Sequence, residues 1–389
     1  MRASQSALRG TITDGAVSNY PYLGVWMDRE VDFTYHATIA LGRGAESFND
    51  MYGCAESLGF PIPLLTAATE TRVVSKAMYG IEFCIGISSM ESRLNRLQTN
   101  WAKRALGISK SRAGKHALLI TECGWSCRLG TLMLENAIML KARIMVLPRQ
   151  HPARQIFEVA RGSPLETWVS QVKQAQSRND FDRAIPDIEE IFGSSEIEAA
   201  SGCKQKRKQI TRTYRQHHVR PILACYDRQA YVKAAETLQP WPYGDWQTAY
   251  GSMDAELMRI DGGGNGWHSF RAWAVVRVTG KWPFALYCDD QECASVTTCP
   301  LCGAESATIM HLLAECNETL LYYREWRMIL GELDTEPRPT APTLRDRIFA
   351  KPYDADQESP VEATARYDFV HRCSQTAAAA LRRQSSEQG

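Results

Sequence analysis

The chain has 389 residues, 44% of them hydrophobic and 23% charged, so it is not a collagen-like repeat, a wholly disordered chain or a small disulfide scaffold. No apolar run approaches the roughly 18 residues that a membrane-spanning helix needs. Twelve cysteines, with no secretory signal before Tyr20, predict a reducing compartment, nuclear or otherwise cytoplasmic, and not secretion.

The formal net charge of +1 conceals an uneven distribution of charge along the chain. Residues 1–230 hold 30 Lys and Arg against 22 Asp and Glu, whereas residues 231–389 hold 15 against 22. The near-neutral total argues against a protein that coats nucleic acid indiscriminately. The basic amino-terminal part leaves room for a localised phosphate-binding face.

The first elements in chain order are a small β element and a set of helices. Residues 18–35 mix aromatic and β-branched side chains around Leu23-Gly24, which indicates a hairpin or a sharp bend. Residues 129–147 are rich in Leu, Met and Ile on all sides and predict a buried helix. The fold class that we expect is mainly α, with a small amino-terminal β element, a helical bundle, an irregular basic middle region and a carboxyl-terminal zinc knuckle.

Residues 88–108 predict an amphipathic helix with a basic stripe beside its apolar face. Apolar residues recur at spacings of three and four, namely Met90, Leu94, Leu97, Trp101, Ala105 and Ile108. The adjoining stripe is formed by Arg93, Arg96, Lys103 and Arg104. These cations either are solvated surface or contact nucleic-acid phosphates, and Trp101 fits the core better than a base-stacking platform.

A second basic segment, residues 204–220, contains no acidic residue. Its candidate phosphate-binding side chains are Lys206, Arg207, Lys208, Arg212 and Arg215. The interleaved Tyr214, His217 and His218 favour single-stranded nucleic acid, because aromatic stacking on bases adds to phosphate contacts. A solvated surface is the alternative interpretation.

The strongest chemical signal is the pattern C-x2-C-x8-H-x4-C, formed by Cys299, Cys302, His311 and Cys316. Zinc prefers four sulfur or nitrogen ligands in a tetrahedron, and three cysteines with one histidine are a common structural set. The x2 spacing lets two thiolates of one tight turn face the metal, and Gly303 supplies the freedom that such a turn needs. The alternative is four unrelated buried residues. A closed four-ligand site leaves no position for a reactive water, so this zinc is structural.

Three further segments concern catalysis, a domain boundary and the carboxyl-terminal tail. Residues 287–290 spell Y-x-D-D, a paired-carboxylate pattern suited to two-metal phosphoryl transfer. The polar residues that follow Asp290 do not fit a returning buried strand, so we interpret Asp289 and Asp290 as a solvated acidic turn. The glycine-rich residues 262–266 predict a break between domains, and residues 331–389 predict a loosely ordered tail with one helix.

Several segments together resemble the reverse transcriptases of non-LTR (LINE-type) retrotransposons. Residues 20–28 resemble the "YLGV.LD" segment of that family, and residues 78–82 followed by 94–108 resemble its "YG.E … L..LQ.…R..LG" thumb region. Residues 122–125 are similar to "ELGW", and residues 271–280 resemble the "LR.RTG" segment that precedes a CCHC knuckle. The segments occur in family order from residue 20 to about 327.

The resemblance, together with the composition of the middle region and the tail, divides the chain into five parts. They are the end of the palm with a primer-grip-like hairpin at 1–40, a helical thumb-like domain at 41–150, a basic helical connecting region at 151–260, a zinc-knuckle domain at 261–330 and the tail at 331–389. Tyr22, Leu23 and Gly24 would support a primer 3′ end. The palm carboxylates of the family would precede residue 20.

The function that we expect is binding of template–primer RNA and DNA by the carboxyl-terminal part of such an enzyme, without polymerase activity of its own and without a membrane role. Mg²⁺ would enter only as part of a complete polymerase, whose upstream portion would be a partner if it is encoded separately. The alternatives are a zinc-stabilised protein-interaction module, or an active RNA-directed DNA polymerase that uses Asp289 and Asp290.

Overall fold

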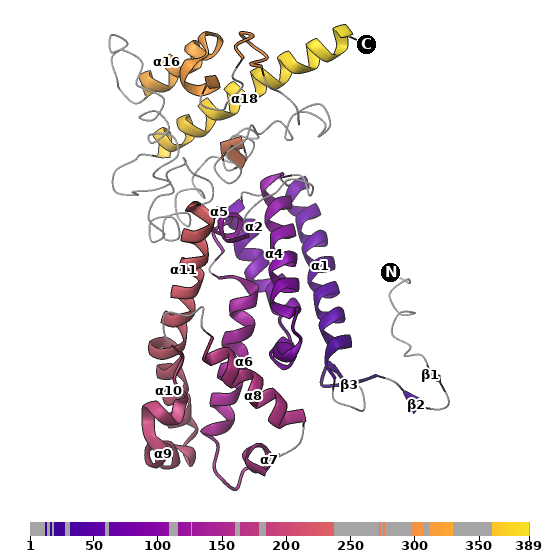
Figure 1. Ribbon diagram of the computed structural model, residues 1–389, viewed down its shortest axis with the longest axis vertical. Helices are drawn as coiled ribbons and strands as arrows, with labels where there is room; N and C mark the ends of the chain where they lie inside the picture. The colour runs from indigo at the N-terminus through magenta and orange to yellow at the C-terminus, as the bar shows by residue number, and fades with distance from the viewer. Residues whose placement is uncertain are drawn as a thin grey trace. The chain divides into compact units, whose positions relative to one another are not determined.

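The computed structural model is mainly helical, with a small antiparallel β element near its amino terminus, as the sequence predicts (Figure 1). Among the helices that it describes, none combines the length and the apolar character that crossing a bilayer requires. The described residues are 12–13, 16–17, 19–27, 32–58, 62–108, 116–125, 127–159, 164–178, 184–236, 272–273, 275–276, 298–305, 311–329 and 360–388.

The β element consists of two two-stranded antiparallel sheets. Strand β1 (Ile12–Thr13) pairs with β2 (Ala16–Val17), and β3 (Tyr20–Tyr22) pairs with β4 (Val25–Met27). In the second pair Tyr22 lies opposite Val25, so Leu23 and Gly24 form a two-residue turn. Both turn residues have positive φ, 49° and 84°, as the hairpin turn that matches the twist of the strands requires. The hairpin predicted at Leu23-Gly24 is therefore confirmed.

The chain divides into two compact units, and the first comprises Met1–Asn49, Thr71–Leu97 and Cys127–Gln229. The helical elements that contribute residues to it are α1 (Thr34–Ser57), the π-helical turn η2 (Thr69–Val74), α3 (Ser75–Ala77), the 3-10 turn η3 (Ile81–Gly86), α4 (Met90–Leu106), α6 (Leu129–Met145), α7 (Pro152–Val159), α8 (Pro164–Gln176), α9 (Ile188–Ser201), α10 (Lys204–Tyr214), the π-helical turn η4 (Arg215–Val219) and α11 (Arg220–Glu236).

Helix α6 forms the core of this unit, and its burial on nearly all sides agrees with its sequence. Two charged residues are buried with it, and each has a partner of opposite charge. Lys141 Nζ lies 2.5 Å from Asp187 Oδ1, and Glu135 binds Arg215 and Arg220. Because a buried charge is costly unless it is paired, these contacts allow a helix with two interior charges to serve as a core element.

The described part of the basic middle region is mainly helical, which corrects the expectation that this region is irregular. Helices α10 and α11 continue one another through η4 (Figure 1). Their buried apolar residues form a stripe, namely Ile210, Tyr214, Val219, Ile222, Leu223, Tyr231 and Ala234. The many cations conceal this stripe in the sequence, because they outnumber the apolar residues without interrupting their helical spacing.

The second unit comprises Asp50–Glu70, Gln98–Ser126 and Ala230–Gly389. Its further helical elements are α2 (Ile62–Ala68), α5 (His116–Glu122), the π-helical turn η6 (His311–Glu315), the 3-10 turn η7 (Asn317–Thr319), α16 (Leu320–Ile329) and α18 (Pro360–Gln388). Helix α18 packs on α16, where the rings of Trp326 and Phe369 stack with centroids 5.2 Å apart. The helix expected within the tail is thus present, and it extends through polar residues to Gln388.

Candidate metal centre and nucleic-acid interface

Four side chains in the second unit converge on one point, and they are the four predicted from the sequence. The sulfur atoms of Cys299, Cys302 and Cys316 and a ring nitrogen of His311 all lie within 4.8 Å of one another. Cys299, His311 and Cys316 are buried, whereas Cys302 is exposed at the edge of the cluster. The cluster could therefore hold one metal ion.

The distances within the cluster fit a tetrahedral zinc site. Bonds of about 2.3 Å to sulfur and about 2.0–2.1 Å to nitrogen place two sulfur ligands about 3.8 Å apart, and a sulfur and a nitrogen ligand about 3.6 Å apart. The sulfurs of Cys299 and Cys316 are 3.9 Å apart, and Cys302 Sγ lies 3.2 Å from His311 Nε2. The donor atoms are thus compatible with zinc without a large rearrangement.

The backbone explains why these four residues meet. Gly303 N–H donates to Cys299 O at 2.9 Å, and Cys299 N–H donates to Ala304 O at 2.8 Å, which closes the turn around the cysteine pair. Gly303 has φ of +74°, a conformation that favours glycine. His311 opens the π-helical turn η6, and Cys316 N–H donates to His311 O at 2.7 Å. A five-residue turn brings the x4 pair to the same side, which an ordinary α-helical turn does less well.

Neighbouring groups orient the imidazole ligand and shift the pKa values of two of the cysteine ligands. His311 Nδ1 lies 3.4 Å from Glu315 Oε2, so this carboxylate can hold the ring with Nε2 toward the cysteines. The backbone N–H of Ala304 lowers the pKa of Cys302 to about 7, whereas burial raises the pKa of Cys316 to about 12. Glu315 is a functional candidate that the ligand spacing alone does not identify.

The second candidate site is the exposed side of α10. The side chains of Lys204, Lys206, Lys208 and Arg212 are exposed there. Arg207 is half-buried and its guanidinium donates to the backbone carbonyl of Ser201, so it is less accessible than its neighbours. At 100° per residue, Lys204, Lys208 and Arg212 follow one stripe, and Lys206 projects from another side.

The first turn of helix α10 carries basic side chains where acidic ones are usually favoured. Its first turn contains no acidic residue and holds Lys204, Lys206 and Arg207, although the partial positive charge of a helix amino terminus favours acidic side chains there. The Cys203 thiol lies immediately before the helix, and the backbone N–H groups of Lys206 and Gln205 lower its pKa. The local field at this helix end therefore favours a negative group.

Two residues of the basic segment do not belong to that surface. Arg215 pairs with the buried Glu135, which explains its half-buried position and leaves its guanidinium less available to a phosphate. Tyr214 is buried and its hydroxyl donates to Pro186 O at 2.7 Å, so its ring is not available to stack on a base. Both partners lie far away in sequence, and the local pattern does not reveal them.

The predicted basic stripe on α4 is only partly exposed. Arg96 and Arg104 are exposed, and the Arg104 guanidinium lies 4.4 Å from the centroid of the Tyr52 ring. Arg93 is half-buried and donates to Thr38 Oγ1 on α1 at 3.2 Å. Lys103 is only 9% exposed, and burial lowers its pKa, which corrects its placement in an exposed stripe. Trp101 is buried, as expected for a core residue.

The hairpin residues Tyr22 and Leu23 are 63% and 77% exposed. The hydroxyl of Tyr79 donates to Leu23 O at 2.5 Å, and its ring lies against Gly24, where a Cβ would come within 3.1 Å. Residues 20–27 and 78–82 are thus brought together, although about 50 residues separate them. The contact leaves the aromatic side chain of Tyr22 at the surface of the turn.

Other sequence-based expectations fall on residues outside the described ranges. These are the glycine-rich segment 262–266 and the Y-x-D-D segment that contains Asp289 and Asp290. In comparisons with known proteins, no protein-family model, no curated protein and no solved structure matches this chain.

Proposed function

We propose that this chain is the carboxyl-terminal part of a LINE-type reverse transcriptase, and that it binds template–primer RNA and DNA without synthesising DNA by itself. The proposal rests on the order of the resembling segments in the sequence, on the cationic start of α10 and on the Cys3His cluster. According to this proposal, the Tyr22–Gly24 hairpin contacts a primer end, and the exposed cations of α4 and α10 contact backbone phosphates.

The observation that carries nucleic-acid binding is the cationic amino terminus of α10. Each cation near a helix amino terminus costs about 0.3–1 kcal/mol of helix stability, and Lys204, Lys206 and Lys208 leave their charges in solvent. A phosphate that binds here would meet these ammonium groups together with the positive end of the helix dipole. A bound phosphate would thus offset the repulsion between these cations and the positive end of the helix dipole.

The metal cluster supports the same proposal in a structural role. Four protein ligands leave no open coordination position, so zinc would stabilise the turns at 298–305 and 311–319 and would not activate water. In this role Cys299, Cys302, His311 and Cys316 hold the ion, and Glu315 orients the imidazole.

The test is binding of a labelled single-stranded oligonucleotide at several salt concentrations, measured by fluorescence anisotropy. The triple variant Lys204→Gln, Lys206→Gln, Lys208→Gln removes three exposed cations from α10. Affinity should fall, and the slope of log K against log salt should become shallower by about two, because each lost single-strand phosphate contact removes about 0.7.

A matched control removes three exposed cations from other helices, with Lys76→Gln, Lys173→Gln and Lys233→Gln. It makes the same change in net charge and should leave the salt slope nearly unchanged. Equal effects of both triple variants would mean that binding follows net charge alone. Absence of oligonucleotide binding by the unaltered chain would favour the alternative of a protein-interaction module.

A further inference from the structure

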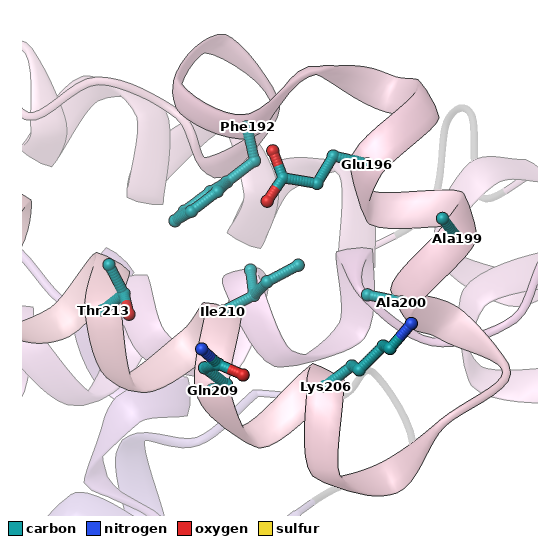
Figure 2. A pocket seen from close by; sticks show the side chains of 8 residues that line it. All are labelled: Phe192, Glu196, Ala199, Ala200, Lys206, Gln209, Ile210 and Thr213. Carbon is teal, nitrogen blue, oxygen red and sulfur yellow. The ribbon is translucent and has the colours of Figure 1, made fainter.

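A hollow of about 450 Å³ lies between α9 and α10 in the first unit (Figure 2). Phe192 and Glu196 extend into it from α9, and Lys206, Gln209 and Thr213 border it from α10, with Ile210 at its floor. An apolar floor with a few polar groups at the rim is the usual composition of a small-molecule or base-binding site. Its volume also falls within the range of such sites.

The hollow exists because α9 is interrupted at Gly193. This residue has φ of 69° and ψ of 154°, which lies outside the helical region and is open to glycine. The interruption separates Phe192 from the helical turn that contains Glu196 and Ala199, and it leaves the Phe192 ring half-buried. In a regular helix, Phe192 and Glu196 would lie one turn apart on the same side of a straight helix.

We propose that this hollow accepts an unstacked base of single-stranded nucleic acid whose phosphates follow the cations of α10. This inference rests on the proposed nucleic-acid binding, and it specifies which part of the nucleic acid, a base, enters the hollow. Phe192 provides the aromatic face on which a base stacks, and such stacking tolerates any base because every base has a π face.

The arrangement of α10 places backbone and base contacts side by side. Lys204, Lys208 and Arg212 recur every four residues and form a stripe along the helix, where successive phosphates can bind. Lys206, Gln209 and Thr213 lie on the adjacent side, which borders the hollow. A strand that follows the stripe can therefore turn a base toward Phe192 without leaving the cationic surface.

Glu196 gives the hollow a chemical preference among bases. Its carboxylate forms neither a hydrogen bond nor an ion pair with any residue in the described parts of the chain. An ionised carboxylate only accepts hydrogen bonds, so it binds the amino group of cytosine or adenine, or the N–H groups of guanine. Uracil and thymine offer the carboxylate only the ring N3–H, which is flanked by two carbonyl oxygens that repel it, so these bases are disfavoured.

The experiment measures binding of oligo(C) and oligo(U), each as RNA and as DNA, by fluorescence anisotropy with the full chain. The unaltered protein should bind oligo(C) more tightly than oligo(U). Phe192→Leu, which keeps an apolar side chain but removes the π face, should weaken binding of both homopolymers by about fivefold or more. Glu196→Gln should reduce the ratio between oligo(C) and oligo(U) toward one.

The matched control is Glu198→Gln, which makes the same charge change on α9 outside the hollow. It should preserve the oligo(C) preference. If the unaltered protein binds both homopolymers equally, or if Phe192→Leu and Glu196→Gln bind as the unaltered protein does, the hollow takes no base although nucleic-acid binding stands. If no oligonucleotide binds, the proposed function itself is wrong. Circular dichroism of each variant checks that the helices are intact.

Discussion

His36 Nε2 and the backbone carbonyl of Tyr79 form a hydrogen bond of 2.8 Å across 43 residues of sequence. The other ring nitrogen, Nδ1, accepts the backbone N–H of Trp26 at 3.2 Å. An imidazole that accepts at Nδ1 and donates at Nε2 is neutral, because a protonated ring has no acceptor. His36 thus joins α1 to the β3–β4 hairpin and to the turn that precedes η3 through one buried, uncharged ring.

This arrangement predicts that the hairpin loosens in acid. Burial lowers the pKa of His36 below its ordinary value of 6.5, so the unfolded chain binds the proton more readily than the folded chain. Stability contributed by His36 is complete well above pH 6.5 and is lost progressively as pH falls below that value. Titration of the His36 ring by NMR should give a pKa below 6.5.

His36→Gln provides the comparison, because an amide can donate and accept but does not titrate in this range. Between pH 7 and pH 5 it should lose less of its free energy of unfolding than the unaltered protein. A normal or raised pKa for His36 would contradict the neutral bridging role.

The metal centre predicts about one zinc per chain by elemental analysis of the purified protein. Cys302→Ser and His311→Ala each remove a ligand and should lose the metal, whereas Cys54→Ser, at an exposed cysteine outside the cluster, should retain it. Glu315→Gln should keep all four ligands but lower zinc affinity by about 10–100-fold, because the imidazole loses its orienting carboxylate. Full zinc content in Cys302→Ser would overturn the ligand assignment.

The ion pair between Arg128 and Asp227 predicts a large loss of stability when it is broken. Arg128 Nε lies 2.5 Å from Asp227 Oδ1, and both side chains are buried. Asp227→Ala leaves the guanidinium buried without its counter-charge and should cost about 3–5 kcal/mol of the free energy of unfolding. Urea denaturation followed by circular dichroism measures this change.

Two comparisons separate the buried charge from general effects of substitution. Glu198→Ala removes the partner of Arg149 in an exposed pair of 3.2 Å and should cost less than about 1 kcal/mol. The double variant Arg128→Met, Asp227→Leu removes both charges and should recover part of the loss. Similar costs for Asp227→Ala and Glu198→Ala would show that burial does not govern the Arg128 pair.

We also predict that the chain does not extend a primer on RNA or DNA with Mg²⁺ or Mn²⁺. Two-metal synthesis needs neighbouring carboxylates on rigid strands, and the strands in the described part of the chain, all within 12–27, hold no Asp or Glu. Primer extension with the purified protein is the assay, with Asp289→Ala, Asp290→Ala in parallel. Extension that disappears in the double variant would identify these aspartates as an active site.

Local spacing predicted the features that depend on near neighbours. Four ligands within 18 residues specify the metal cluster, and the periodicity of α6 predicts its burial. The sequence could not show that Lys103 is buried or that Arg215 faces Glu135, 80 residues away, because both depend on packing between distant segments. The hollow at Phe192 depends on one backbone conformation at Gly193, which a glycine permits without requiring.

The π-helical turn η4 changes the spacing at which residues of α10 and α11 return to the same side of the helix, from about four residues to five. In such a turn side chains five residues apart share a side, so Arg215 and Arg220 reach the same carboxylate, and the buried stripe steps from Tyr214 to Val219. A homologous sequence with one residue fewer between Tyr214 and Val219 would have the ordinary α-helical spacing of four residues there, and it would keep the same buried face. A single-residue gap in an alignment therefore belongs at 215–218, where it preserves the register of everything that follows.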